Sequence, residues 1–339
     1  MKIILISPFQ NRLYRGVETV VDQLAANLER LNHTVVIYAW VGNIKSESRQ
    51  RLVPFYRYFQ RFISALYYRF WLKIDKPDAV VLNFWYHGEQ WLPKHLNFVT
   101  FLHFPASINY ARYKNLNAIF PKNKLVAVSD YVKEEALPFI SNHNCNIIQL
   151  GVDNTKFNPQ NIDFKIQPKN QVHFISASAL EPRKNIDIFI NFLFHVNQPF
   201  FFYHVFGDGA QRLELNTLIN NKKLGSCVFI NTPIKHIELE YSKSHIYVCF
   251  AEGEAFGLAW LEAAASGLPI LAAKIEPYIS IMNESFCCFV DINDNSSIAN
   301  GIDKICANYE QYSRNSIAFA KQHSWEKVAI DLVNLISKN

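Results

Sequence analysis

Short apolar runs alternate with segments of helical periodicity along most of the chain. In the first 40 residues, apolar runs over 2–7 and 33–40 predict buried strands, and apolar residues at helical spacing predict a helix over 17–31 between them. Further strands are predicted over 78–85, 97–104 and 124–129. This strand–helix–strand order predicts a doubly wound α/β domain.

A second series of the same kind follows a polar stretch over 145–171, whose Asn and Pro residues suit a linker. Its predicted strands span 172–180, 201–209, 227–231, 246–252 and 268–273, and its predicted helices span 185–196, 210–224 and 257–266. The 339 residues also exceed the roughly 250–300 that a single core supports. We therefore predict an N-terminal domain over 1–160, a C-terminal domain over 161–315 with a cleft between the two, and a C-terminal helix over 316–339 that packs back toward the N-terminal domain.

Composition narrows the class of protein. The net charge of +5 suits an anionic ligand or a membrane surface and falls short of the charge typical of nucleic-acid binding. The six cysteines form no CxxC pair, which favours a reduced, intracellular protein and argues against metal ligation by thiols. The first residues lack a signal-peptide core, and no apolar run approaches 18 residues, so we expect a cytoplasmic chain, or one lying on the inner face of the membrane.

Three glutamates, Glu252, Glu254 and Glu262, stand in the otherwise apolar segment 251–273. A buried carboxylate is costly unless polar groups hold it. The predicted helix start at Gly257 offers free backbone N–H groups to a phosphate, and neighbouring carboxylates can accept hydrogen bonds from sugar hydroxyls. The segment is therefore typical of a site for a sugar diphosphate. The alternative is that the glutamates are solvated acids that complement the helix dipole.

Two adjacent cations, Arg183 and Lys184, follow the strand predicted over 172–180. Doubly wound folds bind ligands at this carboxyl edge of the sheet, where a guanidinium fork and an ammonium group can neutralise a diphosphate. Gly16, at the start of the first helix, is a second position that could face a phosphate. Taken alone, such a pair of cations is more often a solvated surface.

Together these residues resemble the retaining GT-B glycosyltransferases of glycosyltransferase family 4. The segment EAFGLAWLE matches the E-x7-E motif of that family, and AVSDYVKEE, LGVDNTKFNP, LEPRKNID and FGDGAQRLE resemble four further blocks in the same order. The resemblance extends from residue 2 to about residue 330. It implies two Rossmann-like doubly wound domains that face each other across a cleft, with the nucleotide-sugar donor bound in the C-terminal domain.

The resemblance implies a role for each matching residue. Arg183 and Lys184 would hold the diphosphate, Glu254 would bind donor-sugar hydroxyls, Phe256, Gly257 and Leu258 would offer backbone amides to sugar and phosphate, Glu262 would bind the ribose hydroxyls, and His103 would face the donor sugar from the N-terminal domain. Judged without the family, a histidine beside aromatic residues is more often part of the core. The chain also departs from the family pattern at Arg15, at Ser178-Ala179 and at Leu150, which leaves the fine donor geometry open.

The activity implied is transfer of a hexose, with retention at the anomeric carbon, to a glycan or lipid-linked acceptor in the synthesis of cell-envelope polysaccharide or lipopolysaccharide. The EPRKN segment favours GDP-mannose, with a UDP-sugar as the alternative. No Asp-x-Asp lies between strands, so we expect no metal and no other cofactor. A non-catalytic nucleotide-sugar scaffold is a second hypothesis, and a dehydrogenase is a third that the lack of GxGxxG in the first loop argues against.

A basic and aromatic segment over 51–73 contains no acidic residue. If it is helical, its cations form one stripe beside aromatic residues, a pattern typical of membrane-surface helices. The cations are Arg57, Arg61, Arg69 and Lys73, and the aromatic residues are Phe55, Phe59, Phe62 and Trp71. We expect this helix to dock on an anionic membrane. The alternative is an ordinary helix of the N-terminal domain that packs its aromatic residues inward.

Overall fold

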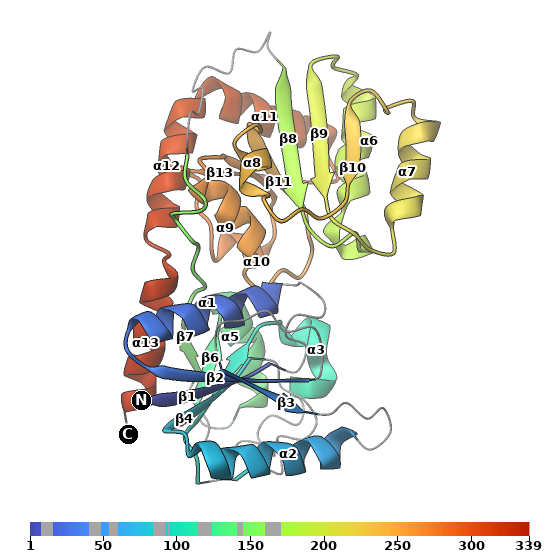
Figure 1. Cartoon of the computed structure of the whole chain (residues 1–339). Coiled ribbons are helices and arrows are strands. Elements are labelled where there is room, and N and C mark those ends of the chain that lie inside the picture. The colour runs from blue at the N-terminus through green and yellow to red at the C-terminus, as the bar shows by residue number, and fades with distance from the viewer. Residues whose placement is uncertain are drawn as a thin grey trace. The chain divides into compact units, whose positions relative to one another are not determined.

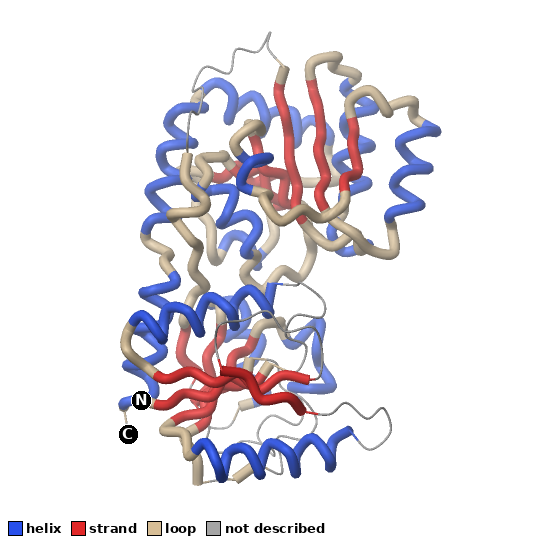
Figure 2. The backbone as a smooth tube through the Cα atoms, in the orientation of Figure 1, coloured by secondary structure: helices blue, strands red, loops and turns tan. Residues whose placement is uncertain are grey.

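The structure of the chain is a computed structural model that describes residues 1–7, 16–40, 49–53, 60–83, 92–93, 95–113, 124–140, 145–159 and 171–338. The chain divides into two compact units. The first unit contains Met1–Gly151 and Trp325–Asn339, and the second contains Val152–Ser324. Each unit is built on one parallel sheet with helices packed on it (Figures 1 and 2).

The first unit contains a seven-stranded parallel sheet in the order β3-β2-β1-β4-β5-β6-β7. Its strands are β1 Lys2–Ile6, β2 Thr34–Trp40, β3 Arg49–Val53, β4 Ala79–Leu82, β5 Phe98–Leu102, β6 Lys124–Ala127 and β7 Cys145–Ile147. Its helices are α1 Gly16–Arg30, α2 Gln60–Asp75, α3 Ala106–Tyr113, α5 Asp130–Ala136 and α13 Trp325–Ser337. The central strands β4 and β5 are buried along their whole length, as expected of parallel strands covered on both faces.

Strands β1 and β4 are neighbours in this sheet, with Ile4 of β1 lying opposite Val80 of β4. One face of the sheet packs against α2 through Tyr68 and Leu72. The end of α2 is fixed by Asp75, whose carboxylate binds the Lys2 ammonium group at 2.9 Å and accepts a hydrogen bond from the Tyr38 hydroxyl at 2.9 Å. This buried polar contact joins α2 to β1 and β2.

The second unit contains a six-stranded parallel sheet in the order β10-β9-β8-β11-β12-β13. Its strands are β8 Val172–Ala177, β9 Phe201–Phe206, β10 Val228–Asn231, β11 Ile246–Cys249, β12 Ile270–Ala273 and β13 Cys287–Val290. Its helices are α6 Ile186–Val196, α7 Arg212–Asn221, α8 Glu238–Tyr241, α9 Leu258–Ala265, α10 Glu276–Ile279, α11 Asn295–Ala307 and α12 Tyr309–Lys321. The strand order reverses between β8 and β11, so the loops after these two strands leave the sheet side by side.

Three expected segments differ from the structure. The helix expected over 316–339 is two helices, α12 and α13, because the chain stops being helical after Lys321 and a new helix begins at Trp325. The helix expected over 51–73 begins only at Gln60, because residues up to Val53 form β3 and pair with β2. The stretch 145–171, expected as a linker, begins with β7, which pairs with β6.

Two further observations bear on the class of protein. None of the helices among the described residues combines the length and the apolar character needed to cross a membrane. All six cysteines are free thiols.

Gly207, at the end of β9, lets two loops approach closely. A Cβ atom at this position would lie 1.8 Å from the backbone oxygen of Ser178, in the loop that follows β8. No side chain fits there without displacing that loop. Arg212 closes the same turn, because its guanidinium donates to the backbone oxygens of Gly207 and Asn231.

We expect Gly207→Ala to destabilise the protein by about 2–4 kcal/mol, because the added methyl group overlaps backbone and not a flexible side chain. Urea-induced unfolding followed by circular dichroism measures the change. Gly225→Ala is the matched control, since a Cβ at Gly225 meets no atom within 4 Å, and its stability should stay within about 0.5 kcal/mol of wild type. Equal stabilities for the two variants would contradict the steric argument.

Candidate donor site

The loops after β8 and β11 carry the residues expected to bind a nucleotide sugar. Arg183 and Lys184 lie in a 3₁₀ turn over Pro182–Lys184, in the loop that follows β8. Glu254 lies between β11 and α9, and Gly257 is the N-cap of α9. Because β8 and β11 are neighbours in the sheet, with Phe174 opposite Ile246, both loops emerge at the carboxyl edge where the strand order reverses.

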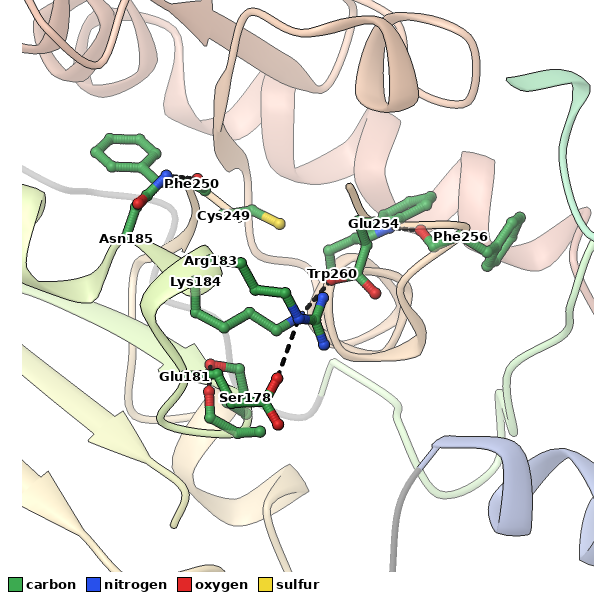
Figure 3. Close-up of polar contacts among 12 residues, drawn as sticks. Ser178, Glu181, Arg183, Lys184, Asn185, Cys249, Phe250, Glu254, Phe256 and Trp260 are labelled. Atoms are coloured by element: carbon green, nitrogen blue, oxygen red, sulfur yellow. Dashed lines mark hydrogen bonds and ion pairs between the residues drawn. The ribbon is translucent and has the colours of Figure 1, made fainter. Parts of the chain in front are cut away.

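Hydrogen bonds hold the two loops together, among them the bond from the Asn185 side chain to the backbone of Phe250 (Figure 3). The N–H of Glu252 donates to the backbone oxygen of Arg183 at 2.7 Å. Asn185 ends the 3₁₀ turn in the left-handed conformation, at φ 51°. Its side-chain amide donates to the backbone oxygen of Phe250 at 3.1 Å and to Glu252 Oε1 at 3.2 Å. Asparagine suits this position because it tolerates positive φ and can hydrogen-bond to nearby backbone.

Lys184 and Glu254 form an ion pair between the loops (Figure 3). Their side chains are only 11% and 20% exposed. Burial alone would raise the pKa of Glu254, but the Lys184 ammonium group, assisted by Arg183, outweighs burial and lowers it. Glu254 is therefore ionised at neutral pH. In this state the cation expected to bind phosphate already holds the carboxylate expected to bind sugar.

Arg183 is the more accessible of the two cations. Its Nε donates to Glu181 Oε2 at 3.0 Å, and the two side chains are 38% and 29% exposed. An exposed ion pair of this kind contributes little stability, so an anionic ligand can replace Glu181 at small cost. The guanidinium fork can then bind two oxygens of a diphosphate.

The start of α9 is shaped by Gly257 and Trp260. Gly257 adopts φ +89°, and a Cβ there would lie 2.6 Å from Trp260 Cδ1. Trp260 is buried, donates its indole N–H to the backbone oxygen of Phe256 and packs its ring against that of Phe256 at 5.6 Å. The first N–H groups of a helix have no partner within the helix, so Leu258, the first residue of α9, offers such a group.

Glu262 lies inside α9, and its environment is opposite to that of Glu254. Its side chain accepts no hydrogen bond from the described part of the chain. Burial raises its pKa from 4.5 to about 7; the charge of Lys156 lowers it and that of Glu238 raises it further. Near neutral pH the group is therefore poised between its neutral and ionised forms.

Two residues expected at the donor site, Gly16 and His103, belong to the first unit. Gly16 is exposed and begins α1, while Arg15 lies outside the described residues. His103 follows β5, stacks on Phe101 with ring centroids 5.5 Å apart, and is nearly buried. Its Nε2 has no hydrogen-bond partner in the described structure, and burial lowers its pKa to about 3. His103 is therefore neutral and can give or receive one hydrogen bond at Nε2, depending on its tautomer.

The structure describes the side chains of only some of the residues expected to contact a membrane. Arg57 lies outside the described residues, and Arg61 lies in α2 at a position whose side chain is not described. Arg69 and Lys73 are exposed on α2. Trp71, expected beside the cations, instead packs partly buried against the core.

Sequence reasoning missed four residues near the site. Asn185 and Glu181 belong to the quoted segment LEPRKNID, where only the two cations were considered. Lys156 belongs to LGVDNTKFNP, and Glu238 lies in a segment without a recognisable motif. Among the described residues, no group of three or more His, Cys, Asp and Glu side chains could hold a metal ion.

We expect Glu262→Gln to stabilise the ligand-free protein at pH 8 by about 1–3 kcal/mol and to leave its stability almost unchanged at pH 4.5. The pKa of Glu262 is higher in the folded chain than in the unfolded chain, so the folded state holds the proton longer and stability falls as the pH rises from 4.5 to about 7. Glutamine removes this loss.

Urea-induced unfolding at several pH values provides the measurement. Glu310→Gln is the control, because Glu310 forms an exposed ion pair with Arg314 on α12. If the difference in stability between Glu262→Gln and wild type stays the same from pH 4.5 to pH 8, Glu262 is well solvated.

Two family models match adjoining parts of the chain. The model "Glycosyltransferase Family 4" matches residues 14–156, and the model "Glycosyl transferases group 1" matches residues 158–323. Their boundary lies close to the start of the second unit at Val152. Arg183, Lys184, Glu254 and Glu262 fall within the second match, and Gly16 and His103 fall within the first.

Individual relatives agree with these matches. The O-antigen biosynthesis glycosyltransferase WclY of Escherichia coli is 26% identical over 166 residues, which cover 47% of this chain and 46% of that protein. A solved glycosyltransferase from Rickettsia africae has a TM-score of 0.82 at 20% identity, with 100% of this chain and 99% of that chain covered. Anabaena HepE in complex with UDP has a TM-score of 0.81 at 15% identity, with both chains covered completely. The chain spans about half the length of the curated relative, shares the GT-B fold of the solved structures, and belongs to the glycosyltransferases.

Proposed function

We propose that this protein transfers a hexose from a nucleotide sugar to a glycan or lipid-linked acceptor, with retention at the anomeric carbon. The observation that carries the proposal is the pairing of the two loops at the switch point of the second unit. It brings Arg183 and Lys184 beside Glu254 and the start of α9. Cations, free helix N–H groups and an ionised carboxylate at one sheet edge match the three parts of a sugar diphosphate.

Each group suits one part of the donor. The Arg183 guanidinium and the Lys184 ammonium group bind the diphosphate oxygens, and the N–H groups at Gly257 and Leu258 add the positive end of α9. Glu254 is ionised, so it accepts hydrogen bonds from sugar hydroxyls. Glu262 accepts from the two ribose hydroxyls once it is ionised.

The cations also serve the chemical step. When the glycosidic bond to phosphate breaks, negative charge grows on the departing nucleoside diphosphate. Arg183 and Lys184 stabilise that charge, and such preorganised electrostatic stabilisation is usually the largest contribution to catalysis. We therefore expect transfer without a metal ion, and His103, whose pKa is lowered by burial, carries no charge near neutral pH.

The identity of the donor rests on two lines of support that differ. The EPRKN segment, residues 181–185, favours GDP-mannose by resemblance to the family. Anabaena HepE, which has the same fold, was solved with UDP. We keep GDP-mannose as the prediction and a UDP-sugar as its alternative. WclY, the O-antigen biosynthesis relative, favours cell-envelope polysaccharide or lipopolysaccharide as the product.

We also propose that α2 docks on an anionic membrane surface. Leu66, Phe70 and Ile74 lie four residues apart along the helix and are 50%, 56% and 51% exposed. Arg69 and Lys73 flank this apolar stripe and are also exposed. An exposed apolar stripe beside cations is typical of interfacial helices. Such docking would bring the enzyme to a lipid-linked acceptor at the inner face of the membrane.

Calorimetric titration with GDP and with UDP tests the donor site. We expect one nucleotide to bind and expect Lys184→Ala and Glu262→Ala each to weaken its binding by about tenfold or more, since each variant loses a charged contact worth about 1.5–3 kcal/mol. Lys321→Ala, an exposed lysine on α12, is the control and should bind as wild type does. If neither nucleotide binds at millimolar concentration, the proposed donor site is wrong.

Turnover assays with the matching sugar nucleotide separate an enzyme from a scaffold. Transfer to an acceptor, full activity in a chelator and an unchanged anomeric configuration in the product's NMR spectrum are the expected results. Donor binding without turnover would favour the scaffold, and loss of activity in chelator would contradict metal-independent transfer.

Vesicle sedimentation tests the membrane proposal. We expect binding to phosphatidylglycerol vesicles and expect Arg69→Glu with Lys73→Glu to weaken it about tenfold or more, because each cation near an anionic surface contributes about 1 kcal/mol. Lys304→Glu with Lys321→Glu, on α11 and α12 of the second unit, is the matched control. Equal sedimentation of both double variants would rule out docking through α2.

A further inference from the structure

An ion pair lies beside the ribose-binding glutamate of the proposed donor site. Lys156 Nζ lies 3.4 Å from Glu238 Oε2, and the two side chains are 40% and 17% exposed. Neither residue belongs to the groups expected to touch a nucleotide. Both carry charge that acts on Glu262, Lys156 favouring its ionised form and Glu238 opposing it.

The backbone fixes Lys156 in this place. Asp153 accepts hydrogen bonds through Oδ1 from the N–H of Thr155 at 3.0 Å and from the N–H of Lys156 at 3.1 Å. The turn that results places Phe157 against Tyr241 of α8, with ring centroids 6.1 Å apart. This explains the LGVDNTKFNP block physically: its Asp forms the turn, its Phe anchors the turn to α8, and its Lys meets Glu238.

The helix that carries Glu238 also packs against the helix that carries Glu262. Tyr241 of α8 donates its hydroxyl to the backbone oxygen of Ala259 in α9 at 3.3 Å. Burial raises the pKa of Tyr241, and the charge of Glu262 raises it further. The turn at Lys156, α8 and α9 therefore form one packed corner, and Glu262 lies on α9 three residues beyond Ala259.

We infer that Lys156 and Glu238 are positioning residues that set the charge on Glu262, and through it the strength with which this unit holds the ribose of a nucleotide. The inference rests on the proposed function of the donor site. An ionised Glu262 accepts hydrogen bonds from both ribose hydroxyls, whereas a protonated one must use its own hydrogen as a donor. Ribose binding therefore follows the charge of Glu262.

Other titratable groups also lie at this corner. His236 contacts Glu238 Oε1 through Nδ1 at 2.8 Å, and the charges that act on Glu262 in the described chain are those of Lys156 and Glu238. Tyr247 and Cys249 of β11 are neutral near pH 7, because burial raises the pKa of both. α12 meets α9 through Phe319 against Trp260 and adds no charge to those acting on Glu262 within the described chain.

The first test measures binding of the intact sugar nucleotide, UDP-glucose or GDP-mannose, by calorimetry from pH 6 to pH 9. A sugar nucleotide is used because its diphosphate does not titrate in this range. We expect wild-type affinity to rise about tenfold between pH 6 and pH 8, as Glu262 ionises around pH 7. Glu262→Gln should bind weakly and with almost no dependence on pH.

The two positioning residues should shift this profile in opposite directions. Lys156→Met should move its midpoint to higher pH, and Glu238→Gln should move it to lower pH. A purely structural role would weaken binding equally at every pH without moving the midpoint. Lys243→Met is the matched control, because Lys243 forms an exposed ion pair with Glu240 at 2.7 Å, and its midpoint should match that of wild type. His236→Gln is tested in parallel to remove the histidine's own titration.

A second readout does not depend on nucleotide binding. NMR titration of the free protein with ¹³C-labelled glutamate carboxyl groups, assigned by comparison with Glu262→Gln, gives the midpoint of Glu262 directly. Opposite shifts in Lys156→Met and Glu238→Gln support the inference, and an unchanged midpoint in both variants overturns it. If these shifts occur but no nucleotide binds, the proposed function fails while the charge control stands, and the link to ribose binding is overturned with the function.

Discussion

The loop that follows β8 and the loop that follows β11 are held together by a buried ion pair and by backbone hydrogen bonds, and the geometry of the proposed donor site depends on this contact. Lys184 supplies the positive charge and Glu254 the negative one. Asn185 adds its left-handed turn and its bond to the backbone oxygen of Phe250. Because the strand order reverses between β8 and β11, the sheet itself brings these loops together.

Two glutamates eight residues apart on one short segment have opposite electrostatic environments. Glu254 lies beside Lys184, whose charge outweighs burial and lowers its pKa. Glu262 has Lys156 and Glu238 near it, whose charges oppose each other, so burial dominates and raises its pKa to about 7. The first carboxylate is a permanent acceptor, while the second can change its charge in the physiological range. This difference comes from the surrounding loops and not from the motif that contains both residues.

The sequence predicted the central strands and the site loops better than the periphery. β1, β8 and β11 are short apolar runs whose burial is set by their own composition, and Gly257 marks the start of α9 without long-range information. β3 and β7 lie at the edges of their sheet, and β3, RQRLV, is mostly polar and is a strand because it pairs with β2. The break between α12 and α13 likewise carries no Gly or Pro signal. Asn185, Lys156 and Glu238 were missed because their roles depend on contacts 65 to 82 residues away along the chain.

The ligand-free site is arranged for binding at some cost in stability. Glu262 is desolvated without a hydrogen bond from the described residues, and an apolar side chain would be more stable at this position. The Lys184–Glu254 ion pair limits the cost of burying its own two charges. Without a ligand, each residue neutralises the other, so the Lys184 ammonium group keeps its position without being an unpaired buried charge. An arriving diphosphate can share Lys184 and free an oxygen of Glu254 for a sugar hydroxyl. In the proposed function, binding of the phosphate and binding of the sugar are thereby coupled through a single ion pair.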